Sequence, residues 1–193
     1  MLIENISQRI LNRLTKNRTF SRVDYLKCKL GLETILIDAA KLIVIYGLAT
    51  VVGLLWQVSL FHIGYMGIRL FAHGVHCKTN LECTLVSCFM LVGTTALINT
   101  VQLPIASVFV MFFINLIFLW NYAPSATKKN GIGNSSDAKK KKLRYKSLIV
   151  NVIIFVMSLL MPVLIGMLIM TGAIMAGFMT TPLAYKLFRE ERI

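Results

Sequence analysis

The chain is short of acidic side chains, with 8 Asp and Glu against 21 Lys and Arg in 193 residues and a formal net charge of +13. Such basicity can indicate nucleic-acid binding. However, 56% of the residues are hydrophobic, which exceeds the apolar content of typical soluble domains. In so apolar a chain, the preference of Lys and Arg for cytosolic connections explains the charge better. We therefore expect no nucleic-acid partner and predict an all-α, polytopic integral membrane protein.

Long apolar segments are separated by short connections, and most approach the roughly 20 residues that a helix needs to cross a bilayer. They are 35–56, 58–72, 84–101, 104–121, 147–167 and 169–185, which predicts about six transmembrane helices. Pro104 is expected to begin the fourth helix, whereas Pro162 and Pro182 are expected to kink or break the last two. Gly166 and Gly172 mark the expected turn between those last two helices.

Three predicted connections, near residues 57, 102 and 168, lack Lys and Arg altogether. Basic residues gather elsewhere: seven before residue 30, eight from Lys128 to Lys146 and three from Lys186 to Arg192. With a cytosolic N-terminus, six crossings place every one of these clusters on the cytosolic side. We therefore expect a multi-pass protein of the lipid bilayer with both termini in the cytosol. A polar, basic N-terminal region precedes the first apolar segment, so we expect no cleavable signal peptide.

The predicted membrane domain covers residues 34–193. One polar region precedes this domain, and a second polar region interrupts it. Residues 1–33 form a predicted cytosolic amphipathic region, because Ile and Leu recur at helical spacing near its start. This helix could lie on an anionic leaflet or pack on the protein's own cytosolic face. The second region is a basic cytosolic loop over 125–146, rich in Lys, Asn, Gly and Ser. Its charge either sets the membrane orientation or attracts an acidic peptide or anionic lipid.

Cysteine is scarce, and the cysteines present do not have the spacing of a common metal site. The four are Cys28, Cys77, Cys83 and Cys88. Disulfides are rare in the cytosol, so we expect free thiols. His73 and His76 lie near Cys77 and Cys83 in the sequence, and all four are acceptable zinc ligands. Their spacing, however, matches no common zinc motif. We therefore expect neither a metal nor a cofactor.

The spacing of Thr79 and Glu82 is that of a capping box at the start of a helix. Such a helix would place Cys83 in its first turn, where free amides and the helix dipole favour a thiolate. On a continuous helix His76 would lie about 10.5 Å along the axis from Cys83, too far for a shared hydrogen bond. Gly74 permits a turn that would bring the two together. We predict a dyad of Cys83 as nucleophile and His76 as general base.

Alternatives for the neighbouring residues stay open at this point. The cysteines could be small buried apolar groups, and Cys77 is an alternative nucleophile. Arg69 could stabilise an oxyanion or serve as a structural cation at the lipid boundary. Ser87 lies on the same helical face as Cys83 and could orient the site or bond to its own backbone.

These residues resemble the accessory gene regulator B (AgrB) family of membrane cysteine endopeptidases. The family pattern is approximately Arg-x3–4-Gly-Gly-x-His-Ala-x6-Cys-x3-Ser. The chain matches it at Arg69, Gly74, His76, Cys83 and Ser87. It differs at His73, where the family usually has Gly, and at Cys77, where the family usually has Ala. A second family motif, Tyr-Ala-Pro-Ala-Asp-Thr, corresponds to Tyr122-Ala123-Pro124-Ser125-Ala126-Thr127 and lacks the acidic residue.

The resemblance implies processing of a short quorum-sensing pheromone precursor of the AgrD type, which carries an acidic C-terminal tail. Cys83 would cleave it near the C-terminal end through a thioester acyl-enzyme, with His76 transferring the proton. Cyclisation would give a thiolactone or lactone autoinducing peptide. The catalytic loop 69–87 would face the cytosol at the cell membrane of a Gram-positive bacterium. A homodimer is a further expectation from the resemblance. The alternative is a non-enzymatic transporter or exporter component.

Overall fold

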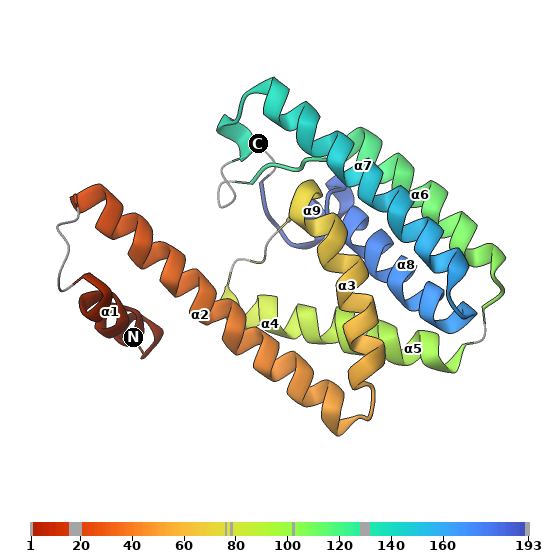
Figure 1. Cartoon of the computed structure of the whole chain (residues 1–193), viewed down its shortest axis with the longest axis horizontal. Coiled ribbons are helices and arrows are strands. Elements are labelled where there is room, and N and C mark those ends of the chain that lie inside the picture. The colour runs from red at the N-terminus through yellow and green to blue at the C-terminus, as the bar shows by residue number, and fades with distance from the viewer. Residues whose placement is uncertain are drawn as a thin grey trace. The chain divides into compact units, whose positions relative to one another are not determined.

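The computed structural model describes residues 2–15, 21–75, 77, 79–101, 103–127 and 132–191. Within these ranges all the regular elements are helices (Figure 1), as predicted for the all-α class. The chain divides into two compact units, Met1–Gly47 and Leu48–Ile193. Each unit has its own internal contacts and is described by itself.

The N-terminal unit contains α1 (Leu2–Thr15) and most of α2 (Arg22–Val51). The helix expected from the Ile and Leu spacing is present as α1. It packs on the first part of α2, where the Ser7 hydroxyl donates to Glu33 Oε1 at 3.2 Å and Ser7 itself is buried. α2 begins well before the predicted apolar segment 35–56, because its first turns carry charged residues that interrupt the apolar run.

The second unit contains the remaining helices. They are α3 (Leu55–Ala72), α4 (Asn80–Cys88), η1 (Phe89–Gly93), α5 (Thr94–Thr100), α6 (Ala106–Tyr122), η2 (Ile132–Asn134), α7 (Asp137–Leu160), α8 (Val163–Phe178) and α9 (Pro182–Leu187). A π-helical turn, η1, joins α4 to α5 as one rod. In the described part of the chain, three helical stretches are long and apolar enough to cross a membrane: Arg22–Val51, Asn80–Thr100 and Asp137–Leu160. α6 and α8 are shorter apolar helices. These helices make the chain an all-α membrane protein, and the number of crossings stays a prediction.

The division between the last two long helices differs from the predicted one. α7 ends at Leu160 and Pro162 is the N-cap of α8, so the chain does break at Pro162, whereas the boundary predicted near residue 168 is wrong. Pro182 likewise occupies the first turn of α9, where its missing N–H leaves no intrahelical bond unmade. Gly166 and Gly172, expected at the turn, lie inside α8. The uniform apolar character of this stretch concealed the boundary, since both helices have the same composition there.

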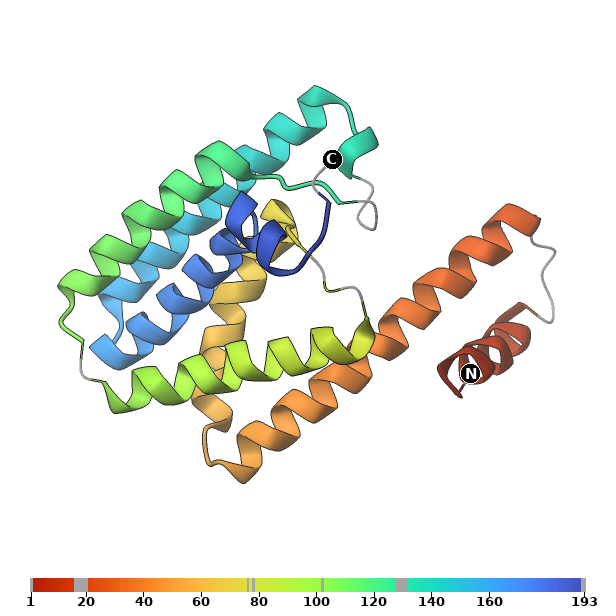
Figure 2. The ribbon, with the colours of Figure 1, turned by 180° about the vertical axis from the view of Figure 1, so that it is seen from behind.

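Helix α8 forms the centre of the bundle, in contact with α3, α6 and α7 (Figure 2). Its glycines allow backbones to approach closely rather than to turn. A Cβ atom at Gly172 would lie 2.0 Å from the carbonyl oxygen of Phe61, and one at Gly64 would lie 1.9 Å from that of Ile169. Small residues at such crossings are typical of helix packing in membranes. The two glycines therefore fix how α3 crosses α8.

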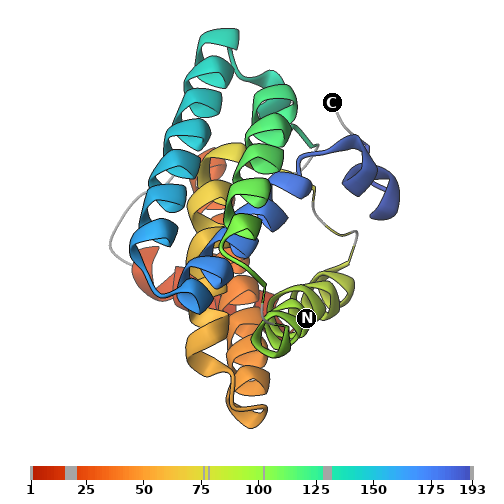
Figure 3. The same ribbon diagram turned by 90° about the vertical axis from the view of Figure 1, so that its right-hand side faces the viewer.

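Three connections meet at one end of this bundle, beside α9 (Figure 3). The amide of Ser125, after α6, donates to the carbonyl of Ala72 at the end of α3 at 2.9 Å. The amide of Val75 donates to Met179, after α8, at 3.0 Å. Segments in direct contact must lie on the same side of a membrane. The arrangement thus agrees with the common side predicted for the connections after α3 and α6 and for the C-terminal segment.

Candidate active site

Arg69, in the last turn of α3, holds the loop that follows this helix. Its guanidinium donates to the carbonyl oxygens of His73, at 3.0 Å, and of Val75. Gly74 lies between these two residues with φ +128°, a conformation that favours glycine. A Cβ atom there would lie 2.4 Å from Arg69 Nη1 and 2.7 Å from the Met179 carbonyl oxygen. The structure thus shows that Arg69 shapes the loop, whereas the two roles expected from the sequence, oxyanion stabilisation and lipid anchoring, stay predictions.

His73 adopts a backbone conformation that is costly for any residue with a side chain, with φ 56° and ψ −138°. Its carbonyl is fixed by Arg69, and its backbone pairs with Ser125 in an isolated bridge. Burial, with the nearby charges of Arg69 and Lys139, lowers the pKa of the His73 imidazole. His73 is not among the described residues that line the cavity beside Cys83. We therefore assign the His73 imidazole to the loop and not to the Cys83 site.

The segment that matches the Tyr-Ala-Pro motif packs directly against this loop. The Ser125 hydroxyl, which is buried, lies 3.1 Å from the Thr180 carbonyl and 2.9 Å from the Tyr185 hydroxyl. Tyr185 in turn donates to the carbonyl of Ala126 at 3.1 Å. The structure therefore brings the two motifs of the family resemblance together, about fifty residues apart in sequence, and joins both to α9.

The predicted capping box is present at the start of α4. Thr79 Oγ1 accepts from the amide of Glu82 at 3.2 Å, and the Glu82 carboxylate accepts from the amide of Thr79 at 3.2 Å. Because α3 ends at Ala72 and α4 begins at Asn80, no continuous helix separates the histidine region from Cys83. The Cys83 amide donates to the backbone carbonyl oxygen of Thr79 at 3.1 Å. Because the Glu82 amide is also bound, to Thr79 Oγ1, the first-turn amides left for an oxyanion are those of Asn80 and Leu81.

Cys83 faces a small cavity of about 50 Å³ at the junction of α3, α4 and the loop. Ser87 lies one helical turn further along α4 and lines the same cavity, and within the described residues its hydroxyl bonds to no backbone carbonyl. Tyr65 and Arg69 contribute from α3, and Cys77 from the loop. His76 lies outside the described residues, so its approach to Cys83 stays a prediction.

A larger apolar groove of about 760 Å³ continues from this cavity. It lies between the α4–η1 rod and the C-terminal segment, and the walls it shares with the cavity are Cys77, Val86, Met90, Met179 and Phe188. Its other apolar walls are Leu85, Phe89, Met175, Phe178 and Leu187. Clefts of this size hold small ligands or short peptide segments. Flexible Met side chains let such a surface adapt to more than one occupant.

Sequence reasoning missed several residues that shape this site. Tyr65 lies four residues before Arg69, and this helical spacing could have placed it on the same face. Met179 and Phe188 carry no local signal, because the bundle brings them from a distant part of the chain. The described residues contain no group of three His, Cys, Asp or Glu side chains that could hold a metal ion, and His76 is not among the residues searched.

Comparisons with known proteins agree with the resemblance. The family model described as accessory gene regulator B matches residues 7–181. An accessory gene regulator protein B of Staphylococcus intermedius is 26% identical over 183 residues, which cover 95% of this chain and 96% of the relative. A putative AgrB-like protein of Listeria monocytogenes serotype 4a (strain HCC23) is 34% identical over 167 residues, or 86% of this chain and 81% of the relative. No solved structure matches the chain.

Proposed function

Because the chain belongs to the accessory gene regulator B family, we propose that it is a membrane cysteine endopeptidase acting on a short peptide precursor. Family membership supports a role in accessory gene regulator quorum sensing. Within that role, the precursor is an AgrD-like peptide with an acidic C-terminal tail. The protein cleaves it near its C-terminal end and promotes its cyclisation to an autoinducing peptide.

One observation carries this proposal: Cys83 sits in the first turn of a capped helix and faces a cavity that continues into the apolar groove. The positive end of a helix dipole lies at the helix N-terminus, and the thiolate is the reactive form of a cysteine. The groove supplies space for a peptide beside that sulfur. A cysteine that served only to fill a core would have neither feature.

The chemistry follows from these positions. His76 accepts the Cys83 proton, and the sulfur attacks the scissile carbonyl. Free amides at the start of α4 stabilise the oxyanion, and the amine leaves with the proton from His76, which generates a thioester. A thiol or hydroxyl upstream in the same peptide then attacks the thioester carbonyl. This step releases Cys83 and closes a thiolactone or lactone ring.

The surroundings of the sulfur favour ring closure over hydrolysis. Apolar walls reduce the access of water to the thioester. Holding both ends of the acyl peptide at one site makes the attack effectively intramolecular. Exchange of one thioester for another also has a small free-energy change, so the ring-closing step that gives a thiolactone needs no external energy source.

We place the site at the cytosolic face of a Gram-positive cell membrane, with both chain termini in the cytosol. The distribution of Lys and Arg supports this orientation, and the contacts at one end of the bundle support a common side for the connections after α3, α6 and α8. A homodimer would be compatible with family membership. Its contacts are not needed for the chemistry, because Cys83 and its cavity come from one chain.

The test replaces each candidate thiol in the full-length protein. Cys83→Ser and Cys77→Ser variants are co-expressed with a tagged precursor, and the cleaved tail is measured by mass spectrometry. We expect Cys83→Ser to abolish cleavage while Cys77→Ser retains it. Cleavage lost only in Cys77→Ser would show that the other thiol is the nucleophile. Cleavage that persists in both variants would reject the cysteine endopeptidase and favour an exporter.

A further inference from the structure

Arg189 ends the last helix in a conformation that suits glycine better than arginine. Its φ is 51°. The surrounding hydrogen bonds are those of a left-handed helix C-cap: Phe188 N donates to Ala184 O at 2.9 Å, and Glu190 N donates to Tyr185 O at 3.1 Å. Gly is the usual residue at such a position, and a side chain there costs about 1 kcal/mol. Stability alone does not explain an arginine at this position.

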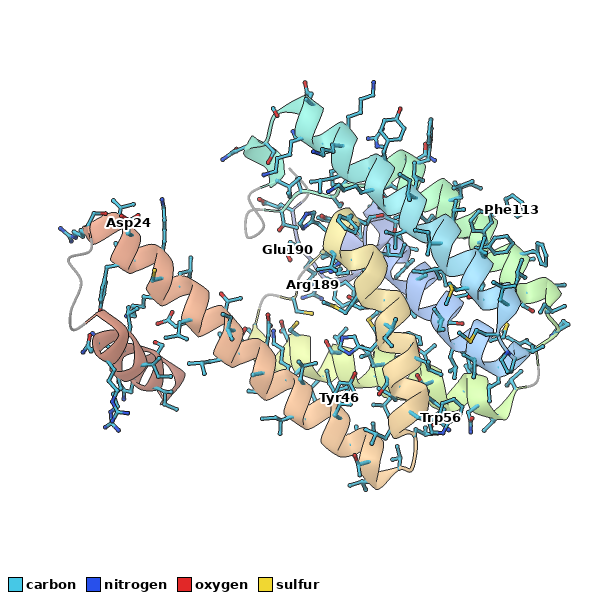
Figure 4. All side chains as sticks on the ribbon, in the orientation of Figure 1. Asp24, Tyr46, Trp56, Phe113, Arg189 and Glu190 are labelled. Carbon is cyan, nitrogen blue, oxygen red and sulfur yellow. The ribbon has the colours of Figure 1, made fainter. Side chains whose placement is uncertain are left out.

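The Arg189 side chain is exposed and lines the apolar groove. Figure 4 labels it next to Glu190, in the segment that follows α9. Glu82 is the other charged residue among the described groove walls, and its carboxylate is bound to the Thr79 amide in the capping box. The described residues provide no ion pair for Arg189. Among the described walls of the groove, which are otherwise apolar apart from the bound Glu82, Arg189 therefore carries the one positive charge, at the rim.

These features fit a peptide segment that combines apolar side chains with a carboxylate. The groove leads away from Cys83 and shares walls with its cavity. During cyclisation the acyl segment must fold back so that its own nucleophile reaches the thioester. The departing segment has no such requirement and can extend along the groove.

We propose that Arg189 is a specificity-determining residue that binds a carboxylate of the departing peptide segment, whose apolar side chains occupy the groove. This inference rests on the proposed function. The left-handed cap places the guanidinium at the rim at a cost in stability. Arg189 binds substrate without taking part in bond making, since the reacting sulfur lies in the adjoining cavity.

The test uses three alkylating probes on the full-length protein in detergent micelles. Bromoacetyl-Phe-Leu-Asp-amide and bromoacetyl-Phe-Leu-Asn-amide place a peptide on the departing side of the electrophile and differ only by the carboxylate. Iodoacetamide is too small to use the groove and reports the reactivity of the thiol alone. The rate of Cys83 alkylation is followed by peptide mapping, which separates it from Cys77.

We expect wild-type protein to prefer the Asp probe by about two- to fivefold, the effect of one exposed ion pair, and to lose this preference in high salt. Arg189→Gly should abolish the preference, leave the iodoacetamide rate unchanged and keep or raise the melting temperature, because Gly suits the cap. Arg189→Lys should retain part of the preference. Loss of stability in Arg189→Gly would contradict the account of the cap.

The outcomes separate this inference from the proposed function. Equal rates for the two peptide probes in wild-type protein, or a preference that survives in Arg189→Gly, would overturn the role of Arg189 while iodoacetamide still reacts at Cys83. Peptide probes whose rate of Cys83 alkylation does not saturate with probe concentration would reject the groove as the binding place. Failure of iodoacetamide to modify Cys83 at neutral pH would instead count against the proposed nucleophile.

Discussion

Helices α8 and α4 show two opposite ways of placing a helix in this protein. α8 is buried along most of its length among α3, α6 and α7, and its glycines bring backbones into contact. α4 contains no buried residue, yet it carries Cys83. The first helix is held by packing, whereas the start of the second is held by a capping box and by a loop wrapped around Arg69. Sites that must admit a substrate are usually built on the less densely packed parts of a fold.

The largest effect is expected from a change that breaks the packing of α8. Gly172→Ala adds a Cβ atom 2.0 Å from a backbone carbonyl of α3, which a side-chain rotation cannot relieve. We expect a loss of about 3 kcal/mol or more in the free energy of unfolding, measured by thermal unfolding in micelles. Gly47→Ala is the matched control, because a Cβ there meets nothing within 4 Å. A tolerated Gly172→Ala would show that α3 and α8 are less closely packed than described.

The next effect concerns the loop that supports α4. Gly74→Ala forces a side chain into φ +128° and against the Arg69 guanidinium. We expect a local cost of about 1–3 kcal/mol and a loss of iodoacetamide reactivity at Cys83, with a smaller change in the melting of the bundle. Gly53→Ala is the control, since its φ of 71° carries the same type of penalty in open space. Equal effects of the two changes on Cys83 would contradict the role of the Arg69 contact.

The contrast between the two helices also explains what the sequence could predict. Apolar runs identified the helical segments, and Thr79 with Glu82 identified the start of α4, because both signals are local. The boundary between α7 and α8 was predicted near residue 168 instead of at Pro162, because the chain is equally apolar on either side of this proline. The apolar groove was not predicted, since Met179 and Phe188 reach it only through the packing of α8. His76 lies outside the described residues, so its half of the dyad is still a prediction.

A smaller effect is expected where α4 depends on its cap. Thr79→Ala removes the oxygen that accepts from the Glu82 amide at 3.2 Å. We expect a cost of about 1 kcal/mol, seen as faster hydrogen exchange in the first turn of α4 and slower alkylation of Cys83. Thr79→Ser keeps the acceptor and should behave as wild type. If both variants alkylate at the wild-type rate, the capping box does not tune the thiol.

A gain in stability is expected at His73. Replacing it by Gly relieves a conformation that costs about 1–3 kcal/mol for a residue with a side chain. Part of this gain is offset by the extra entropy of Gly in the unfolded chain, about 0.5–1 kcal/mol. We therefore expect a net rise of about 1 kcal/mol or less in unfolding free energy. His73→Ala, which keeps the strain, should show no such rise.

The smallest effect is a pH dependence that belongs to the loop and not to the bundle. The pKa of His73 is lowered by burial and by Arg69 and Lys139, so the unfolded chain binds this proton more readily than the folded chain. Stability is therefore full above the unfolded pKa of about 6.5 and falls as the pH drops below it. His73→Asn tolerates positive φ but does not titrate, so its melting temperature should fall less between pH 7 and pH 5. The other histidines are common to both proteins, and parallel curves would show that the His73 imidazole is protonated as easily in the folded chain as in the unfolded one.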